Sequence, residues 1–64
     1  MNFNNLNIGD LVRWTKTGKI SVYMGMVDDD GEENVRFYSA EYGMFQRWIQ
    51  VLEPGMLEVV NEAR

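Results

Sequence analysis

The sequence predicts a small all-β protein in which five short strands form a partly open barrel. Three observations favour this fold class. Short runs of branched and aromatic residues alternate with polar residues, as in strands that bury one face. Turns containing glycine separate these runs. The chain has 64 residues, and folding of a domain of this length removes only roughly 60% of the unfolded surface from water. Because the sequence contains neither cysteine nor histidine, disulfides and Cys/His zinc sites cannot reinforce this small core.

One domain over residues 8–60 accounts for most of the chain. Residues 1–7 are polar and rich in asparagine, which predicts a flexible lead-in, and residues 61–64 form a polar tail. The first residues lack the features of a secretory signal, and no stretch approaches the ~20 apolar residues of a membrane span. With the absence of cysteine, these features predict a cytoplasmic protein without membrane contact.

The first strand is predicted around a turn at residues 8–10 and the branched and aromatic residues that follow it. Ile8, Val12 and Trp14 share a parity and are expected to face inward. Asp10 and Arg13 are expected to reach water. The turn therefore leads directly into a strand with one apolar face.

A second strand is predicted from Ile20 to Val27, after a loop that contains Gly18. Its residues alternate between two faces. One face carries Ile20, Val22, Met24 and Met26, and the other carries Ser21, Tyr23 and Gly25. With Val22 in the core, Tyr23 is expected to point outward.

The pair Asp30-Gly31 gives the strongest hairpin signal in the chain. A type I′ turn needs positive φ, which glycine adopts without steric penalty. The turn predicts a third strand over residues 34–39, in which Val35 and Phe37 face inward. Arg36 and Tyr38 then face outward.

The segment at about 40–52 admits two interpretations. As a strand it alternates poorly, so it would need a bulge. As a helix it places Met44, Phe45, Trp48, Ile49 and Leu52 on one stripe, but Gly43 opposes a helix by ~1 kcal/mol. We favour the strand and keep an α+β fold as the alternative.

Residues 56–60 predict a closing strand with Leu57 and Val59 inward.

The residue types argue against catalysis and against metal binding. Without His or Cys, the two serines lack an ordinary activating base. The acidic run over residues 28–33 resembles the start of an EF-hand loop, but Glu33 and Ser39 stand where that loop needs glycine and glutamate. We expect a non-enzymatic protein with no cofactor and no metal site.

Aromatic and guanidinium side chains are the candidate binding residues. Tyr23, Arg36 and Tyr38 are predicted to form an outward cluster on neighbouring strands, and Tyr and Arg are the usual anchors of protein interfaces. Arg47 and Trp48, in the irregular fourth element, are the second candidate surface. Trp14 and Trp48 are also candidates for the core, because so small a domain needs its largest side chains inside.

Several of these segments together resemble a known group of proteins. They are residues 9–14 (Gly-Asp-Leu-Val-Arg-Trp), Gly18, residues 35–37 (Val-Arg-Phe), Trp48 and residues 57–60 (Leu-Glu-Val-Val). The pattern, which spans residues 8–60, is similar to short SH3-like (KOW-like) barrel proteins of bacteriophages, particularly marine and cyanobacterial phages. Met44 to Pro54 is longer and less regular than in that group. The resemblance implies an SH3-like barrel and a phage accessory protein in the host cytoplasm.

We therefore predict a protein-binding module whose partner is a host or virion protein. The formal net charge is −4, with ten acidic against six basic residues, and this acidity opposes binding to nucleic acid. Two alternatives remain open: a small barrel that binds nucleic acid, and an acidic decoy that occupies a nucleic-acid-binding protein. Association of the chain with a second copy is a further possibility.

Overall fold

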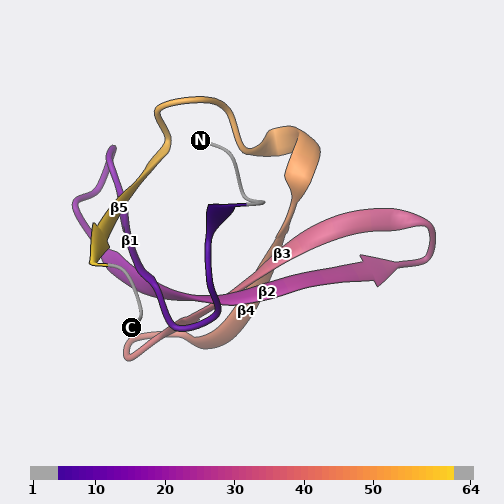
Figure 1. Ribbon diagram of the computed structural model, residues 1–64, viewed down its shortest axis with the longest axis horizontal. Coiled ribbons are helices and arrows are strands. Elements are labelled where there is room, and N and C mark those ends of the chain that lie inside the picture. The colour runs from indigo at the N-terminus through magenta and orange to yellow at the C-terminus, as the bar shows by residue number, and fades with distance from the viewer. Residues whose placement is uncertain (1–4, 62–64) are drawn as a thin grey trace.

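Five antiparallel strands make up the fold of this protein, for which a computed structural model describes residues 5–61. The strands are β1 (Leu11–Trp14), β2 (Ile20–Asp29), β3 (Glu32–Ser39), β4 (Gly43–Trp48) and β5 (Leu57–Asn61). They form one sheet in the order β4-β3-β2-β1-β5, which curls around the core (Figure 1). The sheet is not closed, because β4 and β5 are its two edges. The predicted all-β, partly open barrel is confirmed.

The ends of the chain frame the described domain. Of the predicted lead-in, Leu6 packs against the core, whereas Asn5 and Asn7 are exposed. Residues 1–4 and the predicted tail beyond Asn61 lie outside the described residues. Within residues 5–61 no helix has the length and apolar character needed to cross a bilayer.

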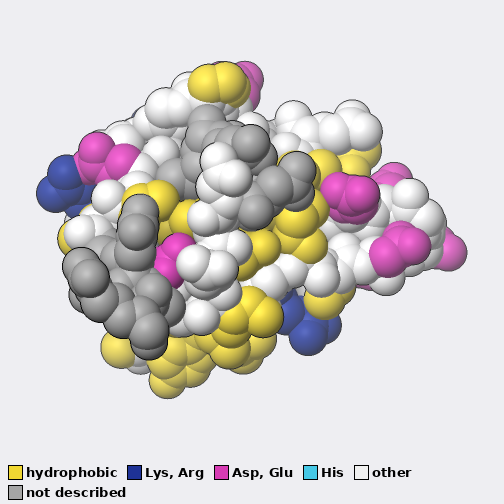
Figure 2. Space-filling view, in the orientation of Figure 1, with side chains coloured by type: hydrophobic (Ala, Val, Ile, Leu, Met, Phe, Trp, Pro, Cys, Tyr) yellow, Lys and Arg dark blue, Asp and Glu magenta, His cyan; other side chains and the backbone are white. Residues whose placement is uncertain are grey.

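The hairpin between β2 and β3 forms where the sequence predicts it. Asp29 pairs with Glu32, and the two residues between them have positive φ, 56° at Asp30 and 83° at Gly31. Positive φ at both central residues is what a type I′ turn requires. The hairpin projects from the rest of the sheet (Figure 1), and acidic side chains gather over its end (Figure 2).

The fourth element is a strand, so the alternative of a helix at about 40–52 is wrong. β4 pairs with β3 from Gly43, opposite Ser39, to Trp48, opposite Asn34, without a bulge. Gly43 has a φ of 73° and ends the turn between the two strands, which prevents a helix from continuing through it. Within residues 40–52 the helical part is Ile49–Val51, a single 3₁₀ turn, η2.

The core lies on the inner face of the curled sheet. Its buried apolar residues are Val12, Tyr23, Val35, Phe37 and Leu57. Partly buried residues pack around them, namely Leu6, Trp14, Met26, Phe45, Ile49 and Leu52. The inward orientation predicted for Val12, Trp14, Val35, Phe37 and Leu57 is confirmed.

The predicted alternation of β2 is wrong, and the error moves Tyr23 from the surface to the core. Tyr23 is only 5% exposed, whereas Val22 is half-buried and pairs with Leu11 and with the exposed Tyr38. A bulge between Tyr23 and Met26, with Gly25 at a φ of 102°, then brings Met26 back to the core face. A bulge inserts an extra residue and so reverses the alternation, which sequence parity does not reveal.

Three further residues near the start and end of the sheet differ from the prediction. Ile8 is exposed beside Gly25, because it precedes the first strand instead of belonging to it. Val59 is exposed because β5 is an edge strand with no neighbour beyond it. Asp10 is buried at 1% exposure, and its Oδ2 accepts a hydrogen bond from the backbone N of Asn7 at 2.9 Å.

The burial of Tyr23 predicts a loss of stability at alkaline pH. Burial raises the pKa of its phenol above the ordinary value of 10.0, so the folded state keeps a proton that the unfolded state releases. The contribution of this phenol to the free energy of unfolding, measured with urea, should therefore be constant up to about pH 9.5 and fall as the pH rises through 10.

Tyr23→Phe should remove that component of the alkaline loss, because phenylalanine has no proton to release. Tyr38→Phe, at an exposed tyrosine of β3, is the matched control and should behave as the wild type does. Identical pH profiles for the wild type and Tyr23→Phe would contradict the prediction.

Candidate binding site

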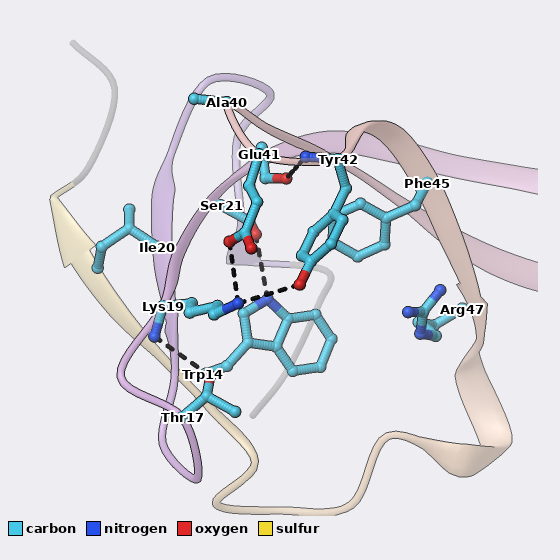
Figure 3. A pocket seen from close by; sticks show the side chains of 11 residues that line it. Trp14, Thr17, Lys19, Ile20, Ser21, Ala40, Glu41, Tyr42, Phe45 and Arg47 are labelled. Carbon is cyan, nitrogen blue, oxygen red and sulfur yellow. Dashed lines mark hydrogen bonds and ion pairs between the residues drawn. The ribbon is translucent and has the colours of Figure 1, made fainter.

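A pocket of about 620 Å³ opens on the inner face of the sheet, between the β1–β2 and β3–β4 turns (Figure 3). The aromatic and charged side chains that line the pocket are Trp14, Lys19, Glu41, Tyr42, Phe45 and Arg47. They come from β1, β4 and the two turns, which the sheet order brings to the same end of the barrel.

The wall of the pocket is an aromatic cluster that continues the core. The ring of Phe37 lies 5.1 Å from Trp14, edge to face, and 5.4 Å from Phe45, stacked. The indole Nε1 of Trp14 donates a hydrogen bond to the Oγ of the buried Ser21 at 3.1 Å. Packing and this bond fix the ring, yet Trp14 stays partly exposed to the pocket.

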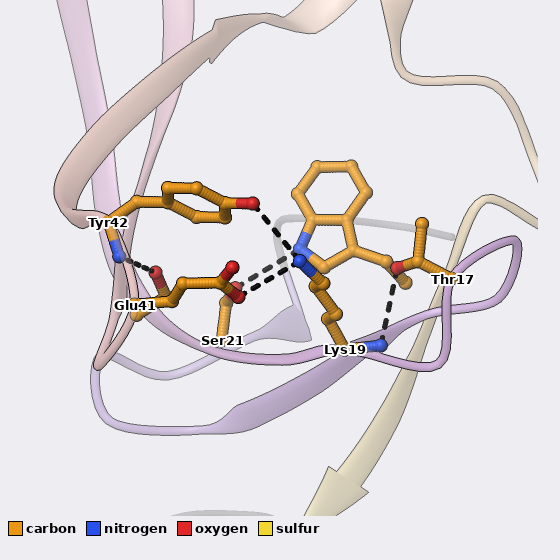
Figure 4. Close-up of polar contacts among 7 residues, drawn as sticks. Thr17, Lys19, Ser21, Glu41 and Tyr42 are labelled. Atoms are coloured by element: carbon orange, nitrogen blue, oxygen red, sulfur yellow. Dashed lines mark hydrogen bonds and ion pairs between the residues drawn. The ribbon is translucent and has the colours of Figure 1, made fainter.

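The turn after β1 places Lys19 at the rim. Gly18, at a φ of 76°, donates its N–H to the carbonyl of Trp14, and the N–H of Trp14 donates to the carbonyl of Lys19. The chain therefore reverses in a few residues, and the Lys19 side chain extends over the pocket towards the β3–β4 turn (Figure 4). In the β3–β4 turn, on the opposite side of the pocket, the Oγ of Ser39 accepts a hydrogen bond from the backbone N of Tyr42 at 2.9 Å.

Lys19 joins the two turns through a polar network (Figure 4). Its Nζ lies 2.9 Å from Oε2 of Glu41 and 3.0 Å from the hydroxyl of Tyr42. The hydrogen bond to Tyr42, followed by that to Glu41, raises the pKa of Lys19, and the hydrogen bond from Lys19 lowers the pKa of Glu41. Both side chains are therefore charged at neutral pH, and each offsets the charge of the other.

Arg47 lies across the pocket and, among the described residues, has no carboxylate partner. Its guanidinium carbon is 4.9 Å from the centroid of the Phe45 ring, and its Nη1 donates to the carbonyl oxygen of Gln46 at 2.9 Å. Among residues 5–61, the ion pairs are those of Arg13 with Glu58 and of Lys19 with Glu41. Within that range Arg47 thus presents a positive charge that no carboxylate neutralises.

The outer face of the sheet carries an apolar row. Leu11 pairs with Val22, Val22 with Tyr38 and Tyr38 with Met44, so the row crosses β1 to β4. Tyr38 and Met44 are exposed, and Leu11 and Val22 are half-buried. Arg36, which pairs with Gln46 in the next row, is also exposed.

The structure separates the five residues predicted to bind a partner. Arg36 and Tyr38 lie on the outer face, as predicted, but Tyr23 is in the core, so the predicted cluster of three does not form. Arg47 lines the pocket, and Trp48, the next and last residue of β4, is exposed opposite Asn34.

Sequence reasoning did not assign Trp14, Lys19, Glu41, Tyr42 and Phe45 to a site. Parity predicts Trp14 in the core, and its side chain is half-buried there. One signal was available: a tryptophan at the last residue of a strand, immediately before a glycine turn, lies at an end of the barrel, where a side chain is only partly covered. The remaining residues carry no pattern that relates them, because the two turns are distant in the sequence.

Comparisons with known protein families, with curated proteins and with solved structures find no match to this chain.

Proposed function

We propose that the chain is a non-enzymatic protein-binding module that holds an extended segment of its partner in the pocket. The observation that carries this proposal is the indole of Trp14, fixed by Ser21 and by Phe37 while its remaining surface faces the pocket. Fixed aromatic side chains are effective anchors, because little conformational freedom is lost when they are covered.

The electrostatics of the pocket favour binding over catalysis. General acid–base catalysis needs a group whose pKa lies near the working pH. In the pocket the pKa of Lys19 moves up and that of Glu41 moves down, so both move away from neutrality. The sequence also has no histidine or cysteine to act as base or nucleophile.

The resemblance to small barrel proteins of bacteriophages supports a biological setting for this activity. In that setting the chain is a phage accessory protein in the host cytoplasm, and the partner is a host or virion protein. An acidic protein of this size, with ten carboxylates against six basic groups, favours a protein partner over nucleic acid.

The test is a selection of peptides on the immobilised protein from a random library, followed by calorimetric titration of the selected peptides. Tyr42→Ala should weaken binding by about tenfold or more, because the tyrosine lines the pocket and orients Lys19. Tyr42 is 65% exposed, so its truncation should leave the fold intact.

Tyr38→Ala is the matched control, since it removes the same side chain from the outer face. It should bind the selected peptides as the wild type does. The opposite result, with binding lost in Tyr38→Ala and kept in Tyr42→Ala, would move the site to the outer face, where the sequence predicts it. Retention on heparin that salt abolishes would favour nucleic acid instead.

A further inference from the structure

We propose that the segment held in the pocket is acidic, and that it places an apolar side chain against Trp14 and a neighbouring carboxylate on Arg47. This inference rests on the proposed function and adds the chemical class of the partner segment. It follows from the balance of charges around the pocket and from the way in which Arg47 is held.

The charged groups of the pocket leave one positive charge in excess. Lys19 and Glu41 bond to each other at 2.9 Å and offset each other's charge. Arg47 is the third charged residue of the lining, and within residues 5–61 it has no carboxylate at ion-pair distance. The pocket is therefore locally positive in a chain whose formal net charge is −4.

The guanidinium of Arg47 is already positioned for a carboxylate. The ring of Phe45 supports it at 4.9 Å, and the carbonyl of Gln46 accepts from Nη1. Arginine has five N–H donors in a planar fork, so donors remain on Nε and Nη2 for an oxygen pair of the ligand. A guanidinium held on an aromatic ring also loses less conformational freedom on binding than a mobile one.

Other classes of ligand fit this arrangement less well. A cationic side chain would meet the positive Arg47 and would find Glu41 already bonded to Lys19. A nucleic acid strand would bring several phosphates to a pocket in which, among residues 5–61, Arg47 is the cation without a carboxylate partner and Glu41 adds a negative charge. Binding of such strands relies on an extended positive groove. A single carboxylate next to an apolar group matches both features of the pocket.

The apolar part of the segment is assigned to the aromatic wall. Trp14, Tyr42 and Phe45 surround the same space from which Arg47 is reached (Figure 3). An apolar side chain there covers indole surface that folding leaves exposed, and it also removes water from around the Arg47 contact. Removal of water strengthens a charge-assisted hydrogen bond.

The experiment is a titration of the ¹⁵N-labelled full chain, observed by NMR, with three capped peptides. They are acetyl-Glu-Leu-Glu-amide, the nearly isosteric but uncharged acetyl-Gln-Leu-Gln-amide, and acetyl-Lys-Leu-Lys-amide, which carries the opposite charge. The Glu peptide should shift the indole N–H of Trp14 and the Nε–H of Arg47, with a Kd about fivefold below that of the Gln peptide.

Two substitutions of Arg47 test the charge directly, and well-dispersed amide spectra show that each variant is folded. Arg47→Gln should abolish the difference between the Glu and Gln peptides without weakening the Gln peptide. Arg47→Glu should reverse the preference in favour of the Lys peptide. Arg36→Gln, which removes an exposed cation of β3 from the other face of the sheet, is the control and should change none of the affinities.

Each of the following outcomes would overturn the inference. Equal affinities for the three peptides, or a preference for the Lys peptide, would show that the pocket does not select an acidic segment while leaving the proposed function intact. If a thymidine oligonucleotide changes the chemical shift of the Trp14 indole N–H more than the Glu peptide does, the ligand of the pocket is nucleic acid and not an acidic segment. If none of the three peptides changes the chemical shift of the Trp14 indole N–H, the inference is also refuted. The library selection then decides separately whether the chain binds peptides.

Discussion

Truncation of Phe37 to alanine is expected to unfold this domain. Phe37 is fully buried, at 0% exposure, and its ring contacts both Trp14 and Phe45. Loss of a buried phenylalanine side chain costs about 3–5 kcal/mol, because both the transferred surface and the resulting cavity contribute. A 64-residue domain has a total stability of only about 3–10 kcal/mol at the usual values per residue. Far-UV circular dichroism during thermal and urea denaturation measures the effect.

Two control variants separate the loss of packing from other causes. Phe37→Leu keeps most of the apolar volume and should cost less than about 2 kcal/mol. Tyr38→Ala changes the adjacent residue, which is 46% exposed on the outer face, and should shift stability only slightly. A Phe37→Ala variant that melts cooperatively at the wild-type temperature would show that the aromatic cluster is not the centre of the core.

The second large effect is expected at Asp10, a residue that the sequence places in water and the structure buries. Asp10→Ala should lower the free energy of unfolding by about 1–3 kcal/mol, because the backbone N–H of Asn7 loses its acceptor Oδ2. The turn that this bond closes also positions Leu6 on the core. Its backbone is tied to β2, since the carbonyl of Asp10 accepts from the N–H of Tyr23.

Asp10→Asn is the informative comparison for this position. Asparagine keeps a side-chain oxygen that can accept from Asn7, so this variant should retain most of the stability that Asp10→Ala loses. Urea denaturation at pH 7 measures both variants. If the two substitutions destabilise the protein equally, the hydrogen bond to Asn7 is not the source of the effect.

The parts of the fold that the sequence predicts correctly are those decided by contacts between near neighbours. Asp30 and Gly31 adopt the positive φ values that the hairpin requires, and such turn preferences are a property of the residues themselves. Val35 and Phe37 face the core because β3 is regular and pairs on both sides. For an uninterrupted strand, alternation is sufficient to assign the faces.

The fourth element shows where local pattern and tertiary structure diverge. Residues 44–52 have a helical stripe, but the β3 edge offers a continuous row of hydrogen bonds to a strand. Pairing takes precedence because an isolated helix of this length is marginal, whereas a fourth strand satisfies the backbone of β3. The stripe is still partly used, since Phe45 and Ile49 pack against the core.

The candidate site depends almost entirely on tertiary structure. The bulge at Gly25 moves Tyr23 from the predicted surface cluster to the core, and parity has no means of locating an extra residue in a strand. The pocket joins Lys19 to Glu41 across 22 residues of sequence, and Arg47 lines it from β4, where it pairs with the buried Val35.

The fold class, the hairpin and the inward residues of regular strands follow from the sequence, since each depends on residue type or on short-range periodicity. Which aromatic side chains remain accessible, and which charges are paired, follows from the folded structure instead. Those properties arise from the curling of the sheet and from contacts between distant turns, so the side chains around Trp14 come together as a candidate site only when the chain has folded.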